Sequence, residues 1–260
     1  MASSLQDVKK IYGLLGYPLI HSFSKDFFNH KFELEDINAE YLNFELEDIG
    51  DLMEVIAQYP HLMGLNVTSP YKEQVLPYLN EVDAHARAIG AVNVIKIVRD
   101  SRNGDIFLKG FNSDTIGFRK SIEPLLAEIK HPQAMILGTG GASKAVSHAF
   151  EQLGVEVMIV SRKKTAATFT YEELTKAMVH AHPIVVNATP LGTYPNTESC
   201  PNFPYRFLSK EHLAYDLVYN PEETLFMKNA KAHGAAIKNG LEMLLLQGFA
   251  AYDIWTTPEK

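Results

Sequence analysis

The sequence predicts an α/β protein with two domains. Over residues 1–114, short apolar runs of strand length alternate with segments whose apolar positions follow helical spacing. Over residues 134–160, a strand, a glycine-rich turn, a helix and a second strand follow one another, as in a dinucleotide-binding βαβ unit. The first pattern predicts a mixed sheet, and the second predicts a Rossmann-like domain.

The expected first domain begins with a strand that ends at the turn Gly16-Tyr17-Pro18. Ser24 is expected to cap the first helix, because the apolar residues after it follow helical spacing. The dipeptide Asn103-Gly104 predicts a hairpin between the last two strands. The expected strands are residues 11–15, 39–44, 63–67, 92–98 and 106–111, and a second helix is expected at 48–59.

A long helix over residues 115–129 is expected to carry the chain out of the first sheet, and His131-Pro132 ends it. The expected strands of the second domain are residues 134–137, 155–160, 183–188, 213–218 and 235–237. The last helix, residues 241–255, has a strongly apolar face that predicts firm packing.

The composition sets limits on the class of protein. With 260 residues, 46% of them hydrophobic, the chain can bury one large core or two modest ones. A net charge of −7 argues against nucleic-acid partners, which need a clustered basic surface. The single cysteine, Cys200, cannot form an internal disulfide, and no cysteine–histidine cluster has metal-ligand spacing. Since neither a signal-peptide core nor a membrane-spanning apolar run occurs, we expect a metal-free cytoplasmic protein.

The glycine-rich turn consists of Gly138, Gly140 and Gly141, with Ala142 after them. Glycines let the backbone approach a pyrophosphate, and the N-terminus of the next helix offers free N–H groups and the positive end of a dipole. Ser143 stands at the third glycine position of the usual fingerprint. A plain turn is the alternative, but the position between strand and helix favours a dinucleotide site.

The residues after the second strand of this unit, Ser161-Arg162-Lys163-Lys164, predict which dinucleotide binds. A carboxylate at this point accepts from the ribose 2′-OH of NAD, whereas a cation accommodates the 2′-phosphate of NADP. Arg162 can stack on the adenine and contact the phosphate with its planar guanidinium. The sequence therefore predicts NADP(H), and a solvated basic loop is the alternative.

A second candidate site follows the expected strand at residues 63–67. The strand carries Asn66, and Thr68, Pro70 and Lys72 come after it. This order places a cation and two neutral hydrogen-bonding side chains at the end of a strand, where a small hydroxylated anion can bind. Another polar segment, residues 111–114, ends in Asp114. A lysine after a strand is commonly solvated, so the interpretation depends on the rest of the chain.

Eight motifs occur in a fixed order. They are residues 21–24 (HSFS), 66–72 (NVTSPYK), 90–93 (GAVN), 112–118 (NSDTIGF), 138–143 (GTGGAS), 187–192 (NATPLG), 216–221 (DLVYNP) and 240–247 (GLEMLLLQ). From about residue 12 to 255, the chain resembles the shikimate dehydrogenase family in this order of motifs. Lys25, Phe28, Ser161 and Thr193 depart from that family's usual proline, histidine, asparagine and methionine.

The resemblance implies reversible, NADPH-dependent reduction of the C3 ketone of 3-dehydroshikimate to shikimate, a step in aromatic amino-acid biosynthesis. Negative charge grows on the carbonyl oxygen as hydride reaches the carbon, so a cationic Lys72 beside it would stabilise that charge and could deliver the proton. Asp114 would bond the same hydroxyl and hold Lys72. Whether Lys72 is the acid or an electrostatic clamp stays open, and an ordinary salt bridge or a capping Asp114 is the alternative.

The resemblance also assigns binding residues. The residues that would bind the small-molecule substrate are Ser22, Ser24 and Tyr219 at the carboxylate, and Asn66, Thr68, Asn93 and Gln247 at the ring hydroxyls. Those that would bind NADP(H) are Gly138, Gly140, Gly141, Ala142, Ser161, Arg162, Lys163, Asn187, Thr189, Leu217 and Gly240. The implied domains are a substrate-binding and catalytic domain at 1–114, a Rossmann domain at 115–237 and a C-terminal helix at 238–260 that returns to the first domain. A monomer or a homodimer fits this architecture.

Two other functions compete with this interpretation. A dual quinate/shikimate dehydrogenase would need altered room for an extra hydroxyl near the serine pair, and its NAD-using members tend to carry an acid after the second Rossmann strand. A non-catalytic sensor of shikimate or quinate should have lost the lysine or the glycine turn, or gained a DNA-binding domain. Since Lys72, Asp114 and the glycine turn are present and the acid is absent, the shikimate enzyme is favoured.

Overall fold

The computed structural model describes residues 8–19, 23–100, 102–127, 129, 131–166 and 168–258. The chain forms two compact units, Met1–Ser113 together with Gly248–Lys260, and Asp114–Gln247. The C-terminal segment expected at 238–260 is therefore divided, because residues up to Gln247 belong to the second unit. The reason is that Lys238 still pairs with a neighbouring strand, and Met243 lies in the apolar core of the second unit.

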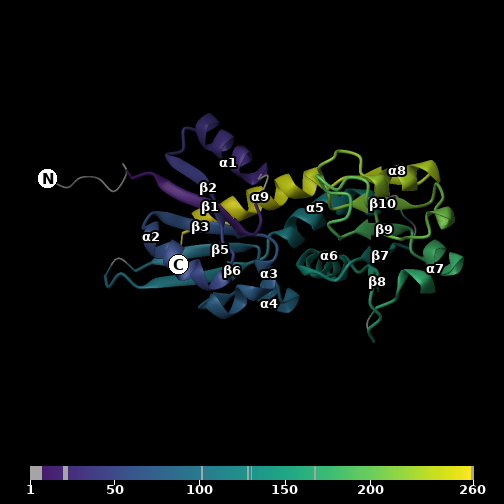
Figure 1. Cartoon of the computed structure of the whole chain (residues 1–260), viewed down its shortest axis with the longest axis horizontal. Helices are drawn as coiled ribbons and strands as arrows, with labels where there is room; N and C mark the ends of the chain where they lie inside the picture. Colours follow the sequence, from purple (N-terminus) through teal and green to yellow (C-terminus); the bar gives the residue numbers. More distant parts are fainter. Residues whose placement is uncertain are drawn as a thin grey trace. The chain divides into compact units, whose positions relative to one another are not determined.

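The first unit contains a six-stranded mixed sheet in the order β2-β1-β3-β5-β6-β4 (Figure 1). The first three strands along the chain run parallel, β5 pairs with β3 and β6 in antiparallel fashion, and β4 pairs with β6 in parallel. The bounds are β1 (Lys10–Gly16), β2 (Ala39–Glu45), β3 (Leu62–Val67), β4 (Glu81–Val82), β5 (Val94–Arg99) and β6 (Ile106–Phe111). Helices of this unit are α1 (Phe23–Leu34), α2 (Leu52–Gln58), α3 (Tyr71–Gln74) and α4 (Ala84–Ile89).

Helices cover both faces of this sheet. Helices α2 and α4 contribute to one apolar cluster, whereas α1 and the end of α9 (Leu241–Thr256) contribute to the other. Trp255 lies in the second cluster, 4% exposed, and its indole N–H donates to the Ile95 carbonyl over 3.0 Å. A Cβ on Gly64 would lie 2.2 Å from this ring, so only glycine lets the indole lie against β3.

The second unit contains a five-stranded, fully parallel sheet in the order β11-β10-β9-β7-β8. Its strands are β7 (Gln133–Leu137), β8 (Glu156–Val160), β9 (Ile184–Asn187), β10 (Leu213–Asp216) and β11 (Ala236–Lys238). Phe169 forms an isolated parallel bridge with Val160, outside the edge strand β8. This bridge occupies the place of the third strand in the Rossmann order 3-2-1-4-5-6, so that strand is reduced to a single pair.

Two layers of helices cover this parallel sheet. Helices α5 (Asp114–Leu126) and α6 (Gly141–Gln152) and the start of α9 pack on one face. On the other face lie α7 (Lys176–Ala181) and α8 (Leu225–Ala232). Neighbouring residues of β7 alternate between these layers, since Ala134 and Ile136 face the first while Met135 and Leu137 face the second. Burial on both faces explains why the central strands β7, β9 and β10 are largely apolar.

The predicted α/β fold with a mixed and a parallel sheet is confirmed, and several bounds differ. The helix expected at 48–59 is split into a 3-10 turn (Ile49–Asp51) and α2. The helix expected to reach residue 129 ends at Leu126, two residues after Pro124, which has no N–H for the helical ladder. Ser24 lies inside the first turn of α1 instead of capping it. Among the described residues, no helix is both long and apolar enough to cross a membrane.

Candidate active site

The first group of predicted site residues lies at one edge of the mixed sheet, where β3 ends, β5 begins and β6 ends. The Val67 N–H donates to the Asn93 carbonyl over 2.8 Å, and the Asn93 N–H donates to the Phe111 carbonyl over 3.0 Å. These ladder bonds place Asn66, Thr68 and Asn93 side by side. We call Asn66, Thr68, Asn93, Asn112 and Ser113 the polar edge; all except the half-buried Thr68 are buried.

Side-chain hydrogen bonds hold the polar edge in place. The Asn93 amide donates from Nδ2 to Ser113 Oγ over 3.0 Å, and its Oδ1 accepts from the Ser113 N–H over 2.7 Å. Asn112 donates from Nδ2 to the Ala91 carbonyl over 2.9 Å. These bonds join the ends of β5 and β6, so the amides have a defined orientation despite lying outside the strands.

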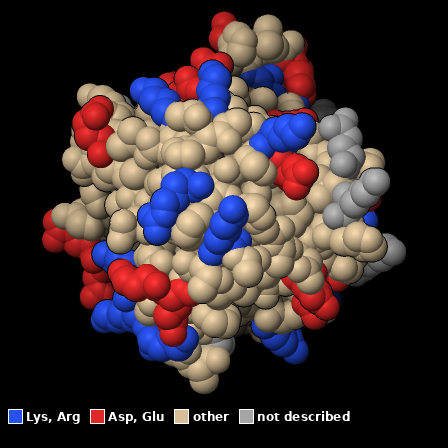
Figure 2. All heavy atoms as spheres, turned by 90° about the vertical axis from the view of Figure 1, so that its right-hand side faces the viewer, with Lys and Arg blue, Asp and Glu red and all other residues tan. Residues whose placement is uncertain are grey.

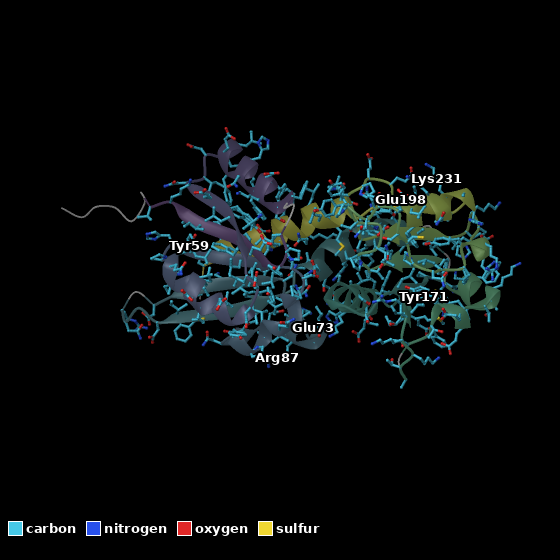
Figure 3. The ribbon with its side chains drawn as sticks, in the orientation of Figure 1. Tyr59, Glu73, Arg87, Tyr171, Glu198 and Lys231 are labelled. Atoms are coloured by element: carbon cyan, nitrogen blue, oxygen red, sulfur yellow. The ribbon has the colours of Figure 1, made fainter. Side chains whose placement is uncertain are left out.

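Lys72 lies in α3, one residue after the buried Tyr71. The Lys72 carbonyl accepts the Val92 N–H over 2.8 Å, which ties α3 to the residue before Asn93. The Tyr71 hydroxyl donates to the Leu46 carbonyl over 2.6 Å and anchors the other side of this turn. Lys72 itself is half-buried, whereas its neighbour Glu73 is exposed (Figure 3). The turn therefore holds the lysine close to the polar edge.

Ser24 lies on α1, half-buried, and hydrogen-bonds the hydroxyl of Tyr41 on β2. The same hydroxyl donates to Asn66 Oδ1 over 2.8 Å. One buried phenol thus connects two predicted substrate residues that are far apart in the chain. Ser22, the other predicted carboxylate-binding serine, lies outside the described residues, as does His21.

The second group of predicted residues lies at the carboxyl end of β7. Gly138 has φ = 119°, and a Cβ there would lie 3.1 Å from the Ala188 carbonyl oxygen, so this position requires glycine. Ser143 is 2% exposed, and its hydroxyl donates to the Gly138 carbonyl over 2.7 Å. The serine at the third glycine position therefore fastens the turn to the helix that follows it.

The turn also leaves room for an anion. A Cβ on Gly140 would have no atom within 4 Å, and this residue is exposed at the start of α6. No side chain of the described chain caps α6, so the first N–H groups of this helix, those of Gly141 and Ala142, can donate to a ligand. The open backbone and the helix N-terminus fit the pyrophosphate of a dinucleotide.

The basic segment after β8 contains two kinds of cation. Lys164 pairs with Glu173 over 2.5 Å and lies over the Phe169 ring, 4.7 Å from its centre. Arg162 and Lys163 are exposed, and among the described residues neither forms an ion pair. Burial raises the pKa of Tyr171 (labelled in Figure 3), and nearby Arg162 partly offsets this rise. Ser161 accepts the Lys163 N–H over 3.3 Å, so it shapes the turn that carries these two cations.

Asn187 and Thr189 follow the carboxyl end of β9. Asn187 is fully buried, and its Oδ1 accepts from the Thr189 hydroxyl over 2.6 Å and from the Thr189 N–H over 3.1 Å. Its Nδ2 donates to Asp216 Oδ1 over 2.9 Å. Asn187 therefore orients Thr189, which is half-buried and accessible to a ligand.

Asp216 ends β10, and no role was predicted for it. Its carboxylate accepts from the Thr224 hydroxyl over 2.5 Å and from the Val218 N–H over 3.0 Å, besides the Asn187 amide. Burial raises its pKa to about 6, although these three donors act in the opposite direction. Asp216 begins the motif at residues 216–221, but an aspartate that ends an apolar strand resembles an ordinary turn residue, so its role is not visible in the sequence.

The other predicted residues of the second unit lie at its strand and helix ends, except Gln247, which lies within α9. A Cβ on Gly240 would lie 2.0 Å from the Leu217 carbonyl oxygen, so glycine lets these two segments touch. Tyr219 is half-buried, and burial raises its pKa. Gln247 packs against Gly117 of α5, and Asp114 is the buried first residue of that helix.

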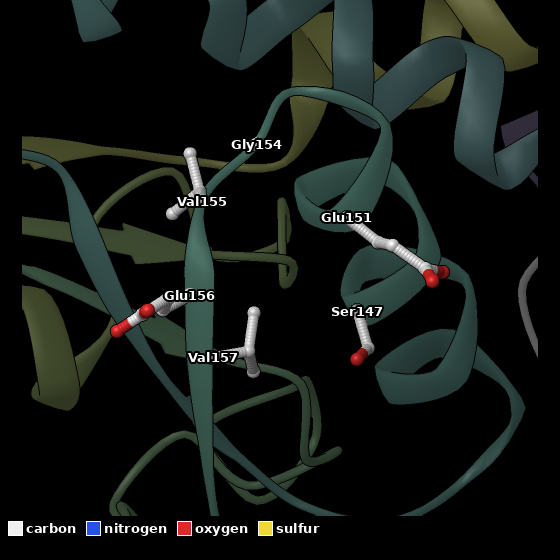
Figure 4. A pocket seen from close by; sticks show the side chains of 6 residues that line it. All are labelled: Ser147, Glu151, Gly154, Val155, Glu156 and Val157. Atoms are coloured by element: carbon white, nitrogen blue, oxygen red, sulfur yellow. The ribbon is translucent and has the colours of Figure 1, made fainter.

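Other surface features of the second unit do not fit an anionic cofactor. A depression of about 470 Å³ lies between the C-terminal part of α6 and the start of β8, at the opposite end from the glycine turn (Figure 4). Its two charged lining residues are Glu151 and Glu156. On the face shown in Figure 2, basic and acidic side chains are interspersed, without a continuous basic patch. Among the described residues, no group of three or more His, Cys, Asp or Glu could hold a metal ion.

The parallel sheet of Rossmann order, with its glycine turn and uncapped helix, defines a dinucleotide-binding α/β protein, joined to a second α/β unit with a buried polar edge. Residues 14–95 match the family model described as shikimate dehydrogenase substrate binding domain. The NADP(+) shikimate dehydrogenase of Methanococcus aeolicus is 34% identical to this chain, in an alignment that covers 95% of this chain and 92% of that protein. The chain belongs to the shikimate dehydrogenase family.

Solved structures agree with this assignment. The shikimate dehydrogenase of Aquifex aeolicus superposes with a TM-score of 0.83 at 34% identity, covering 97% of this chain and 94% of that one. A quinate dehydrogenase of Corynebacterium glutamicum in complex with NAD superposes with a TM-score of 0.81 at 27% identity, covering 95% and 94%. The fold is thus shared by enzymes named for two different substrates.

Proposed function

We propose that this protein is an NADP-dependent shikimate dehydrogenase, which interconverts 3-dehydroshikimate and shikimate. The observation that carries the proposal is a polar edge of buried amides beside Lys72, in a chain whose strand β8 is followed, at residues 161–164, by three cations and no carboxylate. Relatives that are about one-third identical to this chain are named as shikimate dehydrogenases, and these names support the same reaction and cofactor. The expected cytoplasmic location and a monomeric or dimeric state stay predictions.

The polar edge suits a small ring with several hydroxyls. An amide carries both a donor and an acceptor, so the amides of Asn66, Asn93 and Gln247 suit ring hydroxyls, which also donate and accept. Thr68 adds a hydroxyl at the same edge. We assign the carboxylate to Ser22 and Ser24 with Tyr219, because short hydroxyl donors can bind an anion and leave no unpaired charge behind. A ligand without these hydroxyls would cover polar atoms of these amides without adding hydrogen bonds, which is costly.

The residues of the second unit fit NADP(H). The space at Gly140 and the free N–H groups of α6 would hold the pyrophosphate, while Arg162 and Lys163 would hold the 2′-phosphate. Thr189, Leu217 and Gly240 would line the nicotinamide end, with Asn187 holding Thr189 in place. When bound, NADP(H) supplies or accepts the hydride at the ring carbon of the substrate.

Lys72 and Asp114 are the residues that we assign to the proton chemistry. Reduction places negative charge on the carbonyl oxygen, and a lysine ammonium next to it stabilises that charge and can donate a proton to it. Asp114 would accept a hydrogen bond from the same hydroxyl and keep Lys72 charged. In the oxidation direction, the same pair would take the proton from the C3 hydroxyl as hydride leaves.

A dual quinate/shikimate dehydrogenase is the second candidate, and the similarity to the quinate dehydrogenase in complex with NAD is the observation that favours it. The test is the absorbance at 340 nm with shikimate or quinate, each with NADP+ or NAD+. We expect NADPH formation with shikimate to be strongly preferred. Fast quinate turnover with NAD+ would replace the proposal by the second candidate, and tight shikimate binding without turnover would indicate a sensor.

A further inference from the structure

Tyr41 is held in one position by its surroundings in the first unit. It lies on β2 and is completely buried. Asn29 on α1 accepts the Tyr41 N–H over 2.8 Å and donates to the Tyr41 carbonyl over 3.0 Å, so a side chain pairs with the strand as a neighbouring strand would. The ring stacks on Phe28, with 4.7 Å between the ring centres and 11° between the planes. These contacts fix the place of the phenol oxygen.

The Tyr41 hydroxyl contacts two residues of the proposed substrate site. It donates to Asn66 Oδ1 over 2.8 Å and also hydrogen-bonds the Ser24 hydroxyl. A phenol has one proton, so Ser24 donates to the Tyr41 oxygen while that oxygen donates to Asn66. The three groups thus form a series of hydrogen bonds that runs from α1 through β2 to β3.

This series of hydrogen bonds determines which polar atom of Asn66 is available to a ligand. Because Oδ1 accepts from Tyr41, the remaining polar atom of the amide is the donor Nδ2, which among the described residues donates to the Asn93 carbonyl over 3.4 Å. An amide nitrogen has two hydrogens, so one donor stays available. If the amide were free to rotate by 180°, either an acceptor or a donor could face the ligand, and affinity for a hydroxyl of fixed position would fall.

The phenol keeps this role over the whole working range of pH. Burial raises the pKa of Tyr41 well above its usual range, so the hydroxyl stays neutral and protonated. No charge change of Tyr41 can then reverse the direction of its bond to Asn66.

We infer that Tyr41 is a positioning residue of the substrate site, whose buried hydroxyl orients the Asn66 amide as a donor and places Ser24. This inference rests on the proposed function. Phe28, where the family usually has histidine, belongs to the same arrangement because its ring stacks on the phenol.

The first test compares Tyr41→Phe with Tyr12→Phe. Tyr12 is buried in the same aromatic cluster, 2% exposed, and within the described part of the chain its hydroxyl has no hydrogen bond. Losing one buried hydrogen bond to each of two ligand-binding groups should raise KM for shikimate by roughly tenfold in Tyr41→Phe, with KM for NADP+ unchanged. Tyr12→Phe should leave both constants near the wild-type values.

A double-mutant cycle separates positioning from a general loss of stability. Since Tyr41 acts largely through Asn66, most of its effect on KM should disappear in an Asn66→Ala background, whereas independent effects would multiply. If Tyr41→Phe does not fold, Phe28→Leu replaces it, because that variant keeps the phenol but removes the ring that holds it. We then expect a several-fold rise in KM for shikimate.

Four results would contradict the inference, and they are distinguishable. Unchanged KM for shikimate in the folded variant would overturn the role of Tyr41 while leaving the proposed function intact. Multiplicative effects in the cycle, or an equal rise in KM for NADP+, would indicate a structural role only. Absence of shikimate turnover in the wild-type protein would overturn the proposed function, and the inference with it.

Discussion

At the scale of single residues, the buried carboxylate of Asp216 makes the stability of the second unit depend on pH. Its pKa is about 6 in the folded protein, compared with about 3.9 for an unperturbed aspartate. Between these values the folded state binds more protons than the unfolded state, so its stability falls as the pH rises. The difference of about two pKa units corresponds to about 3 kcal/mol, present below pH 4 and lost above pH 6.

Urea unfolding from pH 4 to 7 measures this effect in the wild type and in Asp216→Asn. Other carboxylates titrate in the same range, so the prediction concerns the difference between the two proteins. We expect the wild-type free energy of unfolding to fall relative to the variant as the pH rises. A constant difference over this range would show that Asp216 keeps an ordinary pKa.

The second prediction at this scale concerns the role of the cations after β8 in binding NADP+. Removing Arg162, which is exposed and has no ion pair among the described residues, should raise KM for NADP+ by roughly 10- to 100-fold, the usual worth of a charged hydrogen bond. Turnover with NAD+ should change little, because that cofactor lacks the 2′-phosphate. Lys164→Ala is the matched control, since Lys164 is paired with Glu173. Equal losses with both cofactors would contradict the assignment.

At the scale of elements, the two glycines of the turn after β7 should respond differently to alanine. Gly138 has φ = 119° and the Ala188 carbonyl beside it, so Gly138→Ala should lower the free energy of unfolding by about 1–3 kcal/mol.

Gly140 has φ = −79° and open space around it, so Gly140→Ala should fold with wild-type stability. The new methyl group would instead occupy the space that we assign to the pyrophosphate, raising KM for NADP+ at least roughly tenfold. Thermal unfolding and steady-state kinetics check both; normal NADP+ kinetics in Gly140→Ala would place the cofactor elsewhere.

The elements that carried a periodic pattern were predicted well, and the short ones were not. The hairpin of β5 and β6 and the unit of β7, α6 and β8 have the expected places because apolar runs and glycine turns mark them locally. The two-residue strand β4 was not predicted, since so short a segment has no period and pairs with β6 through the fold. The same holds for Phe169, which takes the place of a whole strand with one bridge.

The site residues also divide into those that the sequence predicted and those that it did not. Lys72, Asn93 and the glycine turn stand in recognisable motifs, and the structure places them at strand ends. Tyr41 stands in none of these motifs, and Asp216 begins one of them without a predicted role, because their hydrogen bonds depend on partners 25 and 29 residues away in the chain. A tyrosine in an apolar strand and an aspartate after one are common, so only the folded chain reveals their hydrogen bonds.

At the scale of the whole molecule, the single tryptophan reports on one unit alone. Trp255 is the only tryptophan of the chain, and it is buried in the core of the first unit. Shikimate at about 100 times its Kd should stabilise that unit by about 2.7 kcal/mol, because it binds the folded state. The midpoint of the fluorescence transition in urea should rise accordingly. Inositol, a ring polyol without a carboxylate, is the control, and an unchanged midpoint with shikimate would show that the polar edge does not bind it.

The central claim, that Lys72 carries the proton chemistry of an NADP-dependent shikimate dehydrogenase, is tested most directly by kcat for shikimate oxidation in Lys72→Ala. Lys10→Ala is the matched control, because Lys10 is exposed at the start of β1, at the opposite end of that strand from the polar edge. We predict that kcat falls at least 100-fold in Lys72→Ala, the usual contribution of a positioned acid or base, and stays near the wild-type value in Lys10→Ala. A folded Lys72→Ala protein that oxidises shikimate at the wild-type rate would contradict the account.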